Sequence, residues 1–261
     1  MINYLFDHLC PQNPEPFCVE FGFDGYNSND GCGSNVARLV LERGWKCLLL
    51  DGDHANPDIN LYQHFLTPEN IVSIFQQYDV PASPEYISID IDSLDLWICR
   101  ALMATYRPMV YSVEYNAHFP HWAAITVTND ASFRWQKDRL YGASLKALTM
   151  LANDIGYTLI SVVPNFDAFF IRNDLIDDSS GYFAPKLPLR NATNRVLHLP
   201  VSNEERLRVL IDYEELCKPD ANIKIAHAKA FRVAKRYLAG HGDIETWFNR
   251  ALRLGRRFFL D

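Results

Sequence analysis

The chain has 261 residues, of which 48% are hydrophobic and 13% aromatic, so it can build a packed core and is not a largely disordered protein. Its formal net charge of −7 argues against a general nucleic-acid-binding protein, which presents a basic face. The sequence has no apolar run near the ~20 residues of a membrane span, no signal-peptide pattern and no C-x-x-C pair among its six cysteines. We therefore expect a cytoplasmic protein without membrane attachment.

Strand and helix signals alternate along residues 17–171. The apolar runs predict seven strands, at residues 17–19, 45–50, 59–62, 86–89, 109–113, 158–163 and 168–171. Helices are expected to begin near four capping residues, Ser34, Thr67, Ser93 and Ser144. Residues 1–16 contain three prolines and are predicted to be a lead-in without a helix, and residues 118–141 are predicted to be a loop. Alternating strands and helices predict an α/β protein with a mostly parallel sheet, helices on both faces and an antiparallel edge formed by the last two strands.

The pattern changes after about residue 173. Three prolines and the lack of a clear period predict an irregular connection over residues 176–202. Ser202 and Glu205 then have the spacing of a capping box, and apolar faces predict helices at 207–213, 226–238 and 244–252. We therefore expect an α/β domain over residues 1–175 and an all-helical extension over residues 203–261.

The predicted extension differs from the rest of the chain in charge. Residues 203–261 contain 12 basic and 9 acidic residues, a net charge of +3, and the remainder contains 13 basic and 23 acidic residues, a net charge of −10. The extension could therefore pack on the acidic body or join two copies into a homo-oligomer, with Arg253, Arg256 and Arg257 as the contact. The alternative is that these arginines form a solvated helix face.

The end of the first predicted strand indicates a nucleoside-type cofactor. The strand ends in Glu20 and then in two glycines three residues apart, Gly22 and Gly25, where the backbone can turn sharply and approach a ligand closely. The second predicted strand ends in Asp51, where nucleotide-binding α/β folds hold ribose hydroxyls. A glycine turn alone is compatible with an ordinary tight turn, but the two features together favour a bound cofactor.

Motifs spread over residues 15–175 resemble, in their order, the FkbM-type class I S-adenosylmethionine-dependent methyltransferase family. The motifs are Val19-Glu20-Phe21-Gly22 with Asp24-Gly25 and Ser28-Asn29, Gly44-Trp45-Lys46 leading to Asp51-Gly52-Asp53, Pro68-Glu69-Asn70-Ile71, Ser88-Ile89-Asp90-Ile91-Asp92, Tyr106-Arg107-Pro108 leading to Glu114-Tyr115-Asn116, Tyr141-Gly142-Ala143-Ser144-Leu145 and Asn165-Phe166-Asp167-Ala168-Phe169-Phe170-Ile171-Arg172. The chain departs from the family in a shorter turn between Gly25 and Ser28 and in residues 126–134, which lack the expected Pro-rich form. The resemblance implies a Rossmann-like class I methyltransferase fold with S-adenosylmethionine as the cofactor.

The resemblance also implies a cofactor site along the carboxyl ends of the strands. Its residues would be Glu20, Gly22, Asp24, Gly25, Ser28, Asn29, Asp51, Asp53, Asn70 and Asp90. The turn from Gly22 to Gly25 would pass under the methionine part of the cofactor. Asp51, with Asp53 as its rival, would accept both ribose hydroxyls, because a carboxylate offers two acceptor oxygens. Asn70 would face the adenine, or else it only begins a helix.

Polar side chains follow the fourth and fifth predicted strands. They are Asp90, Asp92, Glu114 and Asn116. Neighbouring parallel strands place such residues at the same edge of a sheet, and three carboxylates repel unless they are protonated, hydrogen-bonded or bound to a cation. Sugar-hydroxyl methyltransferases of the kind that the chain resembles use such acids to hold Mg²⁺ against the acceptor, which lowers the pKa of its hydroxyl. The alternative is that Asp92 caps the next helix and Glu114 contacts the methionine amine of the cofactor.

Methyl transfer to a hydroxyl also needs an acceptor for the released proton. Asp90 and Glu114 are predicted to take part in catalysis, and His118 is the predicted base because imidazole titrates near neutral pH. His121 is a second candidate, although loop histidines are often only surface residues. Tyr141 and Ser144 are expected to line the acceptor site.

The leading hypothesis is an S-adenosylmethionine-dependent O-methyltransferase that acts on a sugar, a glycan or a small molecule. A nucleotide-binding oxidoreductase of the NAD type is the first alternative, but the sequence lacks its Gly-x-Gly-x-x-Gly pattern. The second is a non-catalytic, cofactor-binding scaffold that uses its helical extension to bind partners.

Overall fold

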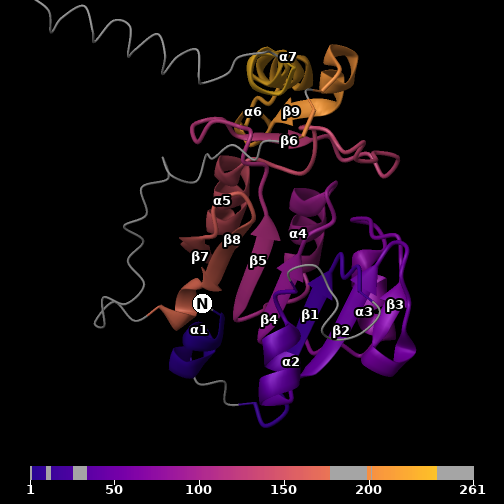
Figure 1. Cartoon of the computed structure of the whole chain (residues 1–261). Coiled ribbons are helices and arrows are strands. Elements are labelled where there is room, and N and C mark those ends of the chain that lie inside the picture. The colour runs from indigo at the N-terminus through magenta and orange to yellow at the C-terminus, as the bar shows by residue number, and fades with distance from the viewer. Residues whose placement is uncertain (1, 10–12, 26–33, 177–198, 201, 240–261) are drawn as a thin grey trace, which may run out of the picture.

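The computed structural model describes residues 2–9, 13–25, 34–176, 199–200 and 202–239 (Figure 1). The α-helices of the described residues are α1 (Ile2–Leu9), α2 (Ala37–Arg43), α3 (Ile71–Gln77), α4 (Asp95–Met103), α5 (Leu145–Asp154), α6 (Tyr213–Leu216) and α7 (Ile223–Ala234). The strands are β1 (Phe17–Phe21), β2 (Lys46–Asp51), β3 (Leu61–Gln63), β4 (Tyr86–Ile89), β5 (Val110–Glu114), β6 (Ile125–Val127), β7 (Tyr157–Val162), β8 (Asp167–Arg172) and β9 (Leu210–Asp212). Short 3-10 helices lie at Pro57–Ile59, Asn173–Leu175 and Glu204–Val209, and a π-helical turn lies at Lys235–Ala239.

Seven of the strands form one sheet in the order β3-β2-β1-β4-β5-β8-β7. The pairs from β3 to β5 are parallel, whereas β8 runs antiparallel to both β5 and β7. This is the strand order of the Rossmann-like class I methyltransferase fold, as the sequence predicted. The central strands are buried on both faces, which explains why they are continuous apolar runs without alternation.

Helical layers cover both faces of the sheet. On one face, α3, α4 and α5 pack on β-strand residues such as Phe21 and Ile87 in the largest buried cluster. On the other face, α1 and α2 pack in a second cluster, in which the Phe6 ring lies 4.8 Å from that of Trp45 and 6.1 Å from that of Tyr86. Apolar side chains therefore cover both faces of the sheet.

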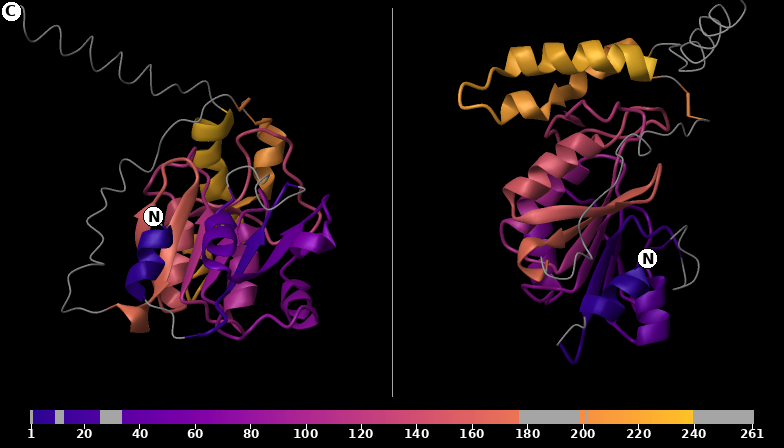
Figure 2. Two further views of the ribbon diagram at one scale, coloured as in Figure 1. Left: turned by 60° about the horizontal axis from the view of Figure 1, so that its bottom comes forward. Right: turned by 90° about the vertical axis from the view of Figure 1, so that its left-hand side faces the viewer.

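A second, two-stranded sheet lies beyond the carboxyl ends of the parallel strands. It pairs β6 with β9 antiparallel, with Ile125 opposite Asp212 and Val127 opposite Leu210. We call β6 together with residues 202–239 the cap; it includes α6 and α7. Figures 1 and 2 show the cap above the edge toward which β4 and β5 point. Leu207 and Tyr213 of the cap belong to the largest buried cluster, and the cap is joined to α4 and α5: Trp97 Nε1 donates to the Val127 carbonyl oxygen at 2.7 Å and Lys146 pairs with Glu214 at 2.8 Å.

Two segments of residues 1–175 contain an element that the sequence did not predict. The lead-in contains helix α1, because its three prolines all follow Leu9 and the helix buries Leu5 and Phe6 against the sheet. The predicted loop at residues 118–141 contains β6. A strand of three residues whose partner lies more than 80 residues away has no sequence signal of its own, since the partner specifies it.

The C-terminal region is mainly helical, as predicted, but the helix expected at residues 207–213 is a 3-10 helix followed by β9 and α6. Asn203 accepts the capping hydrogen bond from the Glu205 N–H at 2.9 Å, and Ser202 Oγ is buried without a hydrogen-bond partner in the part of the chain that the structure describes. The predicted capping box is therefore wrong. Helix α7 confirms the second predicted helix.

Some predictions concern residues that the structure does not describe. The third helix of the extension lies there, and so do Arg253, Arg256 and Arg257. The domain boundaries at residues 175 and 202 stay predictions. Within the described ranges, no helix is both long enough and apolar enough to cross a membrane.

Candidate active site

The chain turns sharply at Gly22, directly after β1. Gly22 has a φ of +75°, and its N–H donates to the carbonyl oxygen of Leu50 in β2 at 2.9 Å. A Cβ atom at Gly22 would lie only 2.1 Å from the carbonyl oxygen of Asp90, which follows β4. Only glycine fits this position, so the predicted turn packs directly against the ends of β2 and β4.

Glu20 holds the entrance of helix α2. Its carboxylate accepts hydrogen bonds from Ser34 Oγ at 2.6 Å and from the Asn35 N–H at 2.7 Å, and burial raises its pKa to about 7. The Asn35 amide in turn donates to Ser88 Oγ at 3.0 Å and to Asp167 Oδ2 at 2.9 Å. Glu20 therefore anchors the segment that leads into α2, and contact with a cofactor stays a prediction.

The other residues of the predicted glycine turn are described only in part. Gly25 is buried and Asp24 is exposed, whereas Ser28 and Asn29 lie outside the described residues. Their contact with the cofactor stays a prediction.

Asp51 lies at the end of β2, on the same edge as Gly22. Its Oδ1 atom accepts from the N–H groups of Asp53 and His54, both at 2.8 Å, and lies 2.7 Å from His54 Nδ1. Its side chain is 13% exposed, whereas Asp53 is exposed on the turn. Of the two rivals for the ribose hydroxyls, Asp51 is thus the one whose side chain is fixed in place.

Asn70 closes the turn before α3. Its Oδ1 accepts from the Thr67 N–H and its Nδ2 donates to the Phe65 carbonyl oxygen, both at 2.8 Å. The amide is therefore used within the chain. This geometry favours the structural alternative over contact with adenine.

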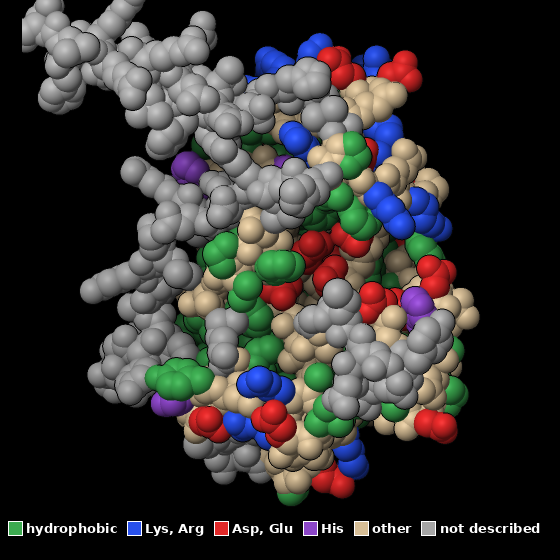
Figure 3. All heavy atoms as spheres, in the orientation of Figure 1, with side chains coloured by type: hydrophobic (Ala, Val, Ile, Leu, Met, Phe, Trp, Pro, Cys, Tyr) green, Lys and Arg blue, Asp and Glu red, His purple; other side chains and the backbone are tan. Residues whose placement is uncertain are grey.

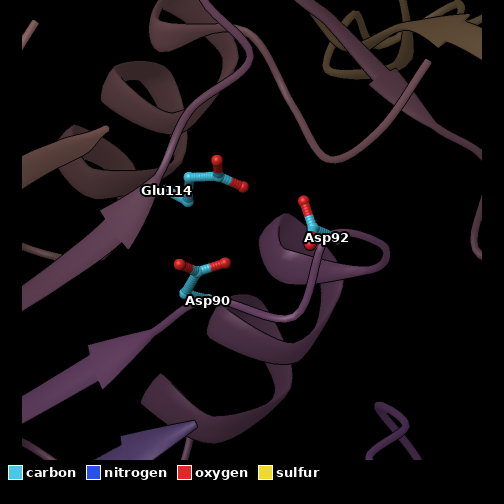
Figure 4. A group of neighbouring side chains, drawn as sticks. All are labelled: Asp90, Asp92 and Glu114. Atoms are coloured by element: carbon cyan, nitrogen blue, oxygen red, sulfur yellow. The ribbon is translucent and has the colours of Figure 1, made fainter. Parts of the chain in front are cut away.

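Asp90, Asp92 and Glu114 converge at the ends of β4 and β5 (Figure 4), and we call them the acid triad. One ligand oxygen from each lies within 4.8 Å of the others, and all three side chains are half-buried. β4 and β5 are parallel neighbours, which brings Asp90 and Glu114 together as the sequence predicted. Figure 3 shows acidic side chains gathered in a hollow near the middle of this face, below the cap.

Asp95 shapes the loop that carries Asp92. Its carboxylate accepts from the N–H groups of Ile91 and Ser93, both at 2.9 Å, and Asp92 between them takes a φ of +54°. Helix α4 begins without a side-chain cap from its N-cap residue, Leu94. The predictions that Ser93 or Asp92 caps this helix are therefore wrong, and the Asp92 side chain is left for the triad.

The triad and its surroundings carry raised pKa values. Burial raises the pKa of Asp90 and of Glu114 well above the ordinary range, and the neighbouring carboxylates raise both further. Burial also raises the pKa of Asp92 to about 6 and that of Asp95 to about 7. Asp167 adds a further acid, because it lies directly opposite Glu114 in the β5–β8 ladder. Like charges at opposed positions repel, so the cluster requires bound protons or a cation.

The triad suits a hard divalent cation. All of its donors are carboxylate oxygens, which Mg²⁺ and Ca²⁺ prefer over nitrogen or sulfur ligands. A bound cation would also reduce the repulsion among the three carboxylates. The residues present therefore fit the predicted Mg²⁺.

Asn116 is not directed at the triad. It is buried, and its Nδ2 donates to the carbonyl oxygens of Arg139 at 2.9 Å and of Tyr141 at 3.0 Å, while its Oδ1 accepts from the His118 N–H at 3.0 Å. These bonds fasten the segment around Tyr141 to the end of β5. This geometry favours a structural role over the predicted metal ligation.

His118 is half-buried beside Arg139. Burial, together with the Arg139 charge, lowers the His118 pKa to about 4, so its imidazole is neutral at neutral pH. The His118 ring lies 6.4 Å from the ring of Tyr141. Ser144 caps α5 by accepting from the Ala147 N–H at 3.3 Å, so its expected place in the acceptor site is not supported.

Three site residues were missed by the sequence reasoning. Asp95 bonds residues only two and four positions before it, and Asn35 bonds Ser88 and Asp167, which are far from it in the sequence; the sequence shows no pattern for either. Asp167 could have been found, because it begins a strand predicted to be antiparallel and therefore starts at the edge where Glu114 ends.

No family model matches the sequence, and neither does any curated protein. The resemblance to the FkbM-type family therefore stays a hypothesis.

Several solved structures, two of them of methyltransferases by name, match at a low level of similarity. The MycE methyltransferase from the mycinamycin biosynthetic pathway, in complex with Mg, SAH and mycinamycin VI, has 16% sequence identity and a TM-score of 0.40, with 66% of this chain and 50% of that chain covered. An O-methyltransferase family protein from Burkholderia thailandensis has 8% identity and a TM-score of 0.35, with 65% and 55% covered. TnmH has 13% identity and a TM-score of 0.32, with 63% and 52% covered. The chain spans about half the length of these proteins, and likeness at this level carries no argument about its activity.

Proposed function

We propose that this protein is an S-adenosylmethionine-dependent methyltransferase that methylates a hydroxyl group of a sugar, a glycan or a small molecule. The observation that carries the proposal is the acid triad, which lies at the carboxyl edge of the sheet in direct continuation of the Gly22 turn. Ligands of open α/β sheets bind outside this edge. The strand order of the sheet supports the same assignment.

The proposed cofactor site follows the edge from β2 to β4. The Gly22 turn would pass under the methionine part of the cofactor, since no side chain intervenes there. Asp51 would accept the ribose hydroxyls through Oδ2, because the neighbouring turn already occupies Oδ1. The acceptor hydroxyl would lie farther along the edge, at the triad.

Asp90, Asp92 and Glu114 would hold Mg²⁺. A bound Mg²⁺ supplies Lewis acidity, which lowers the pKa of the acceptor hydroxyl and orients it. S-adenosylmethionine would supply the methyl group: its S–CH₃ bond would break with the electron pair left on sulfur, an O–CH₃ bond would form on the acceptor, and the hydroxyl proton would be released. His118 would accept this proton, but the reason for which it was predicted is wrong: its pKa is lowered to about 4, so its imidazole is neutral and only weakly basic.

An NAD-type oxidoreductase is the weaker alternative. Dinucleotide-binding folds have a parallel sixth strand in the order 3-2-1-4-5-6, whereas here the strand beside β5 is the antiparallel β8. A non-catalytic scaffold is also disfavoured, because a binding role that uses only the cap leaves the converging acids without a purpose.

Titration calorimetry on the purified full chain tests the proposal. We expect S-adenosylhomocysteine to bind and NAD to show no binding, with S-adenosylhomocysteine affinity unchanged by exhaustive EDTA treatment. EDTA should abolish methyl transfer once an acceptor is identified. Binding of NAD without binding of S-adenosylhomocysteine would contradict the proposed function. Activity that survives EDTA would contradict only the role of Mg²⁺ in the proposed function.

A further inference from the structure

We propose that Trp135 and Tyr141 form an aromatic wall beside the acid triad, and that this wall selects acceptors whose hydroxyl groups are carried on a ring with a flat apolar face. The inference rests on the proposed function, because it concerns the acceptor side of the same site. The residues lie in the segment between β6 and α5, outside the cofactor part of the edge.

The wall is defined by ring contacts. The centroids of the Trp135 and Tyr141 rings lie 5.7 Å apart with their planes at 59°, and the His118 ring lies 6.4 Å from Tyr141 at 90°. Tyr141 is 6% exposed, whereas Trp135 is only half-buried and keeps part of its surface accessible. Trp135 is therefore the member that keeps accessible surface for a ligand to contact.

The neighbours of Tyr141 place the wall next to the triad. The Tyr141 carbonyl oxygen is bonded to Asn116 Nδ2, and Asn116 lies two residues beyond Glu114. On the other side, a Cβ atom at Gly142 would lie 3.4 Å from Asp95 Oδ2, and Asp95 holds the loop of Asp92. The backbone around Tyr141 therefore contacts Asn116, which lies near Glu114, and Asp95, which holds the loop of Asp92. Consistent with this position, burial raises the Tyr141 pKa and the charges of the triad raise it further.

The wall is fixed before any ligand arrives. Trp135 Nε1 donates to the Asp138 carbonyl oxygen at 2.7 Å, so the indole is oriented and its only donor is already used. Asp138 is a buried residue, with 7% of its surface exposed. Its carboxylate pairs with Arg206 of the cap and accepts a hydrogen bond from the Leu140 N–H at 3.2 Å. A pre-oriented side chain loses little conformational freedom on binding, which favours affinity.

These features determine the chemistry of the acceptor. With its N–H bonded within the chain, Trp135 can offer only its apolar face, which stacks on planar rings and on the C–H face of a sugar ring. The triad meanwhile requires hydroxyl groups at one side of that ring. A hydroxylated aryl ring and a pyranose both meet this description, whereas an acyclic polyol offers no flat face.

The test uses binding of ring probes to the full chain in the presence of S-adenosylhomocysteine and MgCl₂. Catechol and methyl α-D-mannopyranoside serve as the aryl and sugar probes, glycerol serves as the acyclic probe, and saturation-transfer NMR titrations give the affinities. The variants are Trp135→Ala, Trp135→Phe, Trp135→Leu and the matched control Trp122→Ala. Trp122 is 52% exposed and contacts the ring of Tyr237 instead.

We expect at least one ring probe to bind more tightly than glycerol, and the probe that binds identifies the ring type. Trp135→Ala and Trp135→Leu should lower the affinity for that probe roughly tenfold. Trp135→Phe should retain most of the affinity, and Trp122→Ala should leave it unchanged. Trp135→Leu keeps apolar volume without a flat face, so it gives the answer if Trp135→Ala fails to fold.

Equal affinity of the ring probe for wild type and Trp135→Leu overturns the inference, and so does a lack of preference for either ring over glycerol. Calorimetry of S-adenosylhomocysteine on the same proteins separates the two proposals. No binding to wild type counts against the proposed function, whereas normal binding combined with a negative ring-probe result counts against the aromatic wall alone.

Discussion

Replacing Gly22 with alanine tests the central feature of the site, which is the direct packing of the first turn on the Asp90 backbone. The new Cβ atom would face two penalties: a φ of +75°, which L-residues rarely adopt, and a separation of 2.1 Å from the Asp90 carbonyl oxygen. Gly44→Ala is the matched control. Gly44 ends helix α2 with a φ of +66°, and a Cβ atom there would have nothing within 4 Å.

The two substitutions share the backbone penalty and differ in the clash. A left-handed conformation costs an alanine about 1–2 kcal/mol, and the loss of glycine freedom in the unfolded chain offsets about 0.4–1 kcal/mol of this. Gly44→Ala should therefore destabilise by about 1 kcal/mol. The clash at Gly22 can be relieved only by moving backbone, and overpacking of this kind costs about 1–3 kcal/mol more. We expect Gly22→Ala to lower the free energy of unfolding by about 2–4 kcal/mol.

Urea unfolding followed by circular dichroism measures both effects, and calorimetry with S-adenosylhomocysteine measures the consequence for the site. Any relaxation around Gly22 shifts Asp90, so Gly22→Ala should also lose most of its cofactor affinity, whereas Gly44→Ala should bind normally. If the two variants were equally stable and bound S-adenosylhomocysteine as wild type does, the reasoning that the turn positions the triad would be refuted.

Three further predictions follow from the geometry. Asp51→Ala should weaken the binding of S-adenosylhomocysteine by about tenfold or more, since each charge-assisted hydrogen bond contributes about 1.5–3 kcal/mol. Asp51→Asn keeps an oxygen that can accept from the turn and should therefore retain more affinity. Equal affinity of Asp51→Ala and wild type in calorimetry would place the ribose elsewhere. Burial raises the pKa of Asp92 to about 6 and those of Glu20 and Asp95 to about 7, so these groups stabilise the metal-free protein below their unfolded pKa values and lose that contribution as pH rises through ~6–7. The lowered pKa of His118 acts in the opposite direction up to its ordinary value of ~6.5. Scanning calorimetry should accordingly show a falling melting temperature between pH ~6.5 and pH ~7.5, with a larger stabilisation by MgCl₂ at the higher pH, and a flat profile would contradict the raised pKa values. Truncation after residue 200 should give an unfolded or insoluble product, because β6 loses its partner strand and the buried cluster loses the residues that the cap contributes. A folded product that binds S-adenosylhomocysteine would show instead that the extension is an independent appendage.

The sheet could be predicted from the sequence because its strands carry their own signal. The apolar run at 86–89 matches β4 in full, and the other long strands agree within a few residues. The central strands β1, β4 and β5 are buried on both faces, so continuous hydrophobicity identifies them without knowledge of their partners. β6 and β9 carry no such signal. Each has three residues, and each forms only because the other lies beside it.

The site divides in the same way. Gly22, Asp51, Asp90 and Glu114 could be assigned to one edge from the sequence, because each follows a strand whose direction is known. The roles of loop residues could not, since they depend on contacts that the sequence does not encode locally. Asn116 illustrates this: its position beyond β5 suggested a metal ligand, but its amide is bonded to a segment more than 20 residues away.

The acid cluster is difficult to explain as a device for stability. Asp90, Asp92 and Glu114 converge with Asp167 opposite the last of them, and burial combined with mutual repulsion raises the pKa of Asp90 and Glu114 well above the ordinary range. Apolar residues of similar volume would stabilise the same positions better. The surrounding chain nevertheless supports the acids, since Asp95 folds the loop that carries Asp92. Supports for an arrangement that opposes folding indicate selection for a ligand, and repelling carboxylates favour a ligand with positive charge. A divalent cation and the sulfonium of S-adenosylmethionine both carry that charge. If they bind as proposed, they would offset the free energy that the cluster costs, and the affinity of the site and the stability of the protein would be linked through the same side chains.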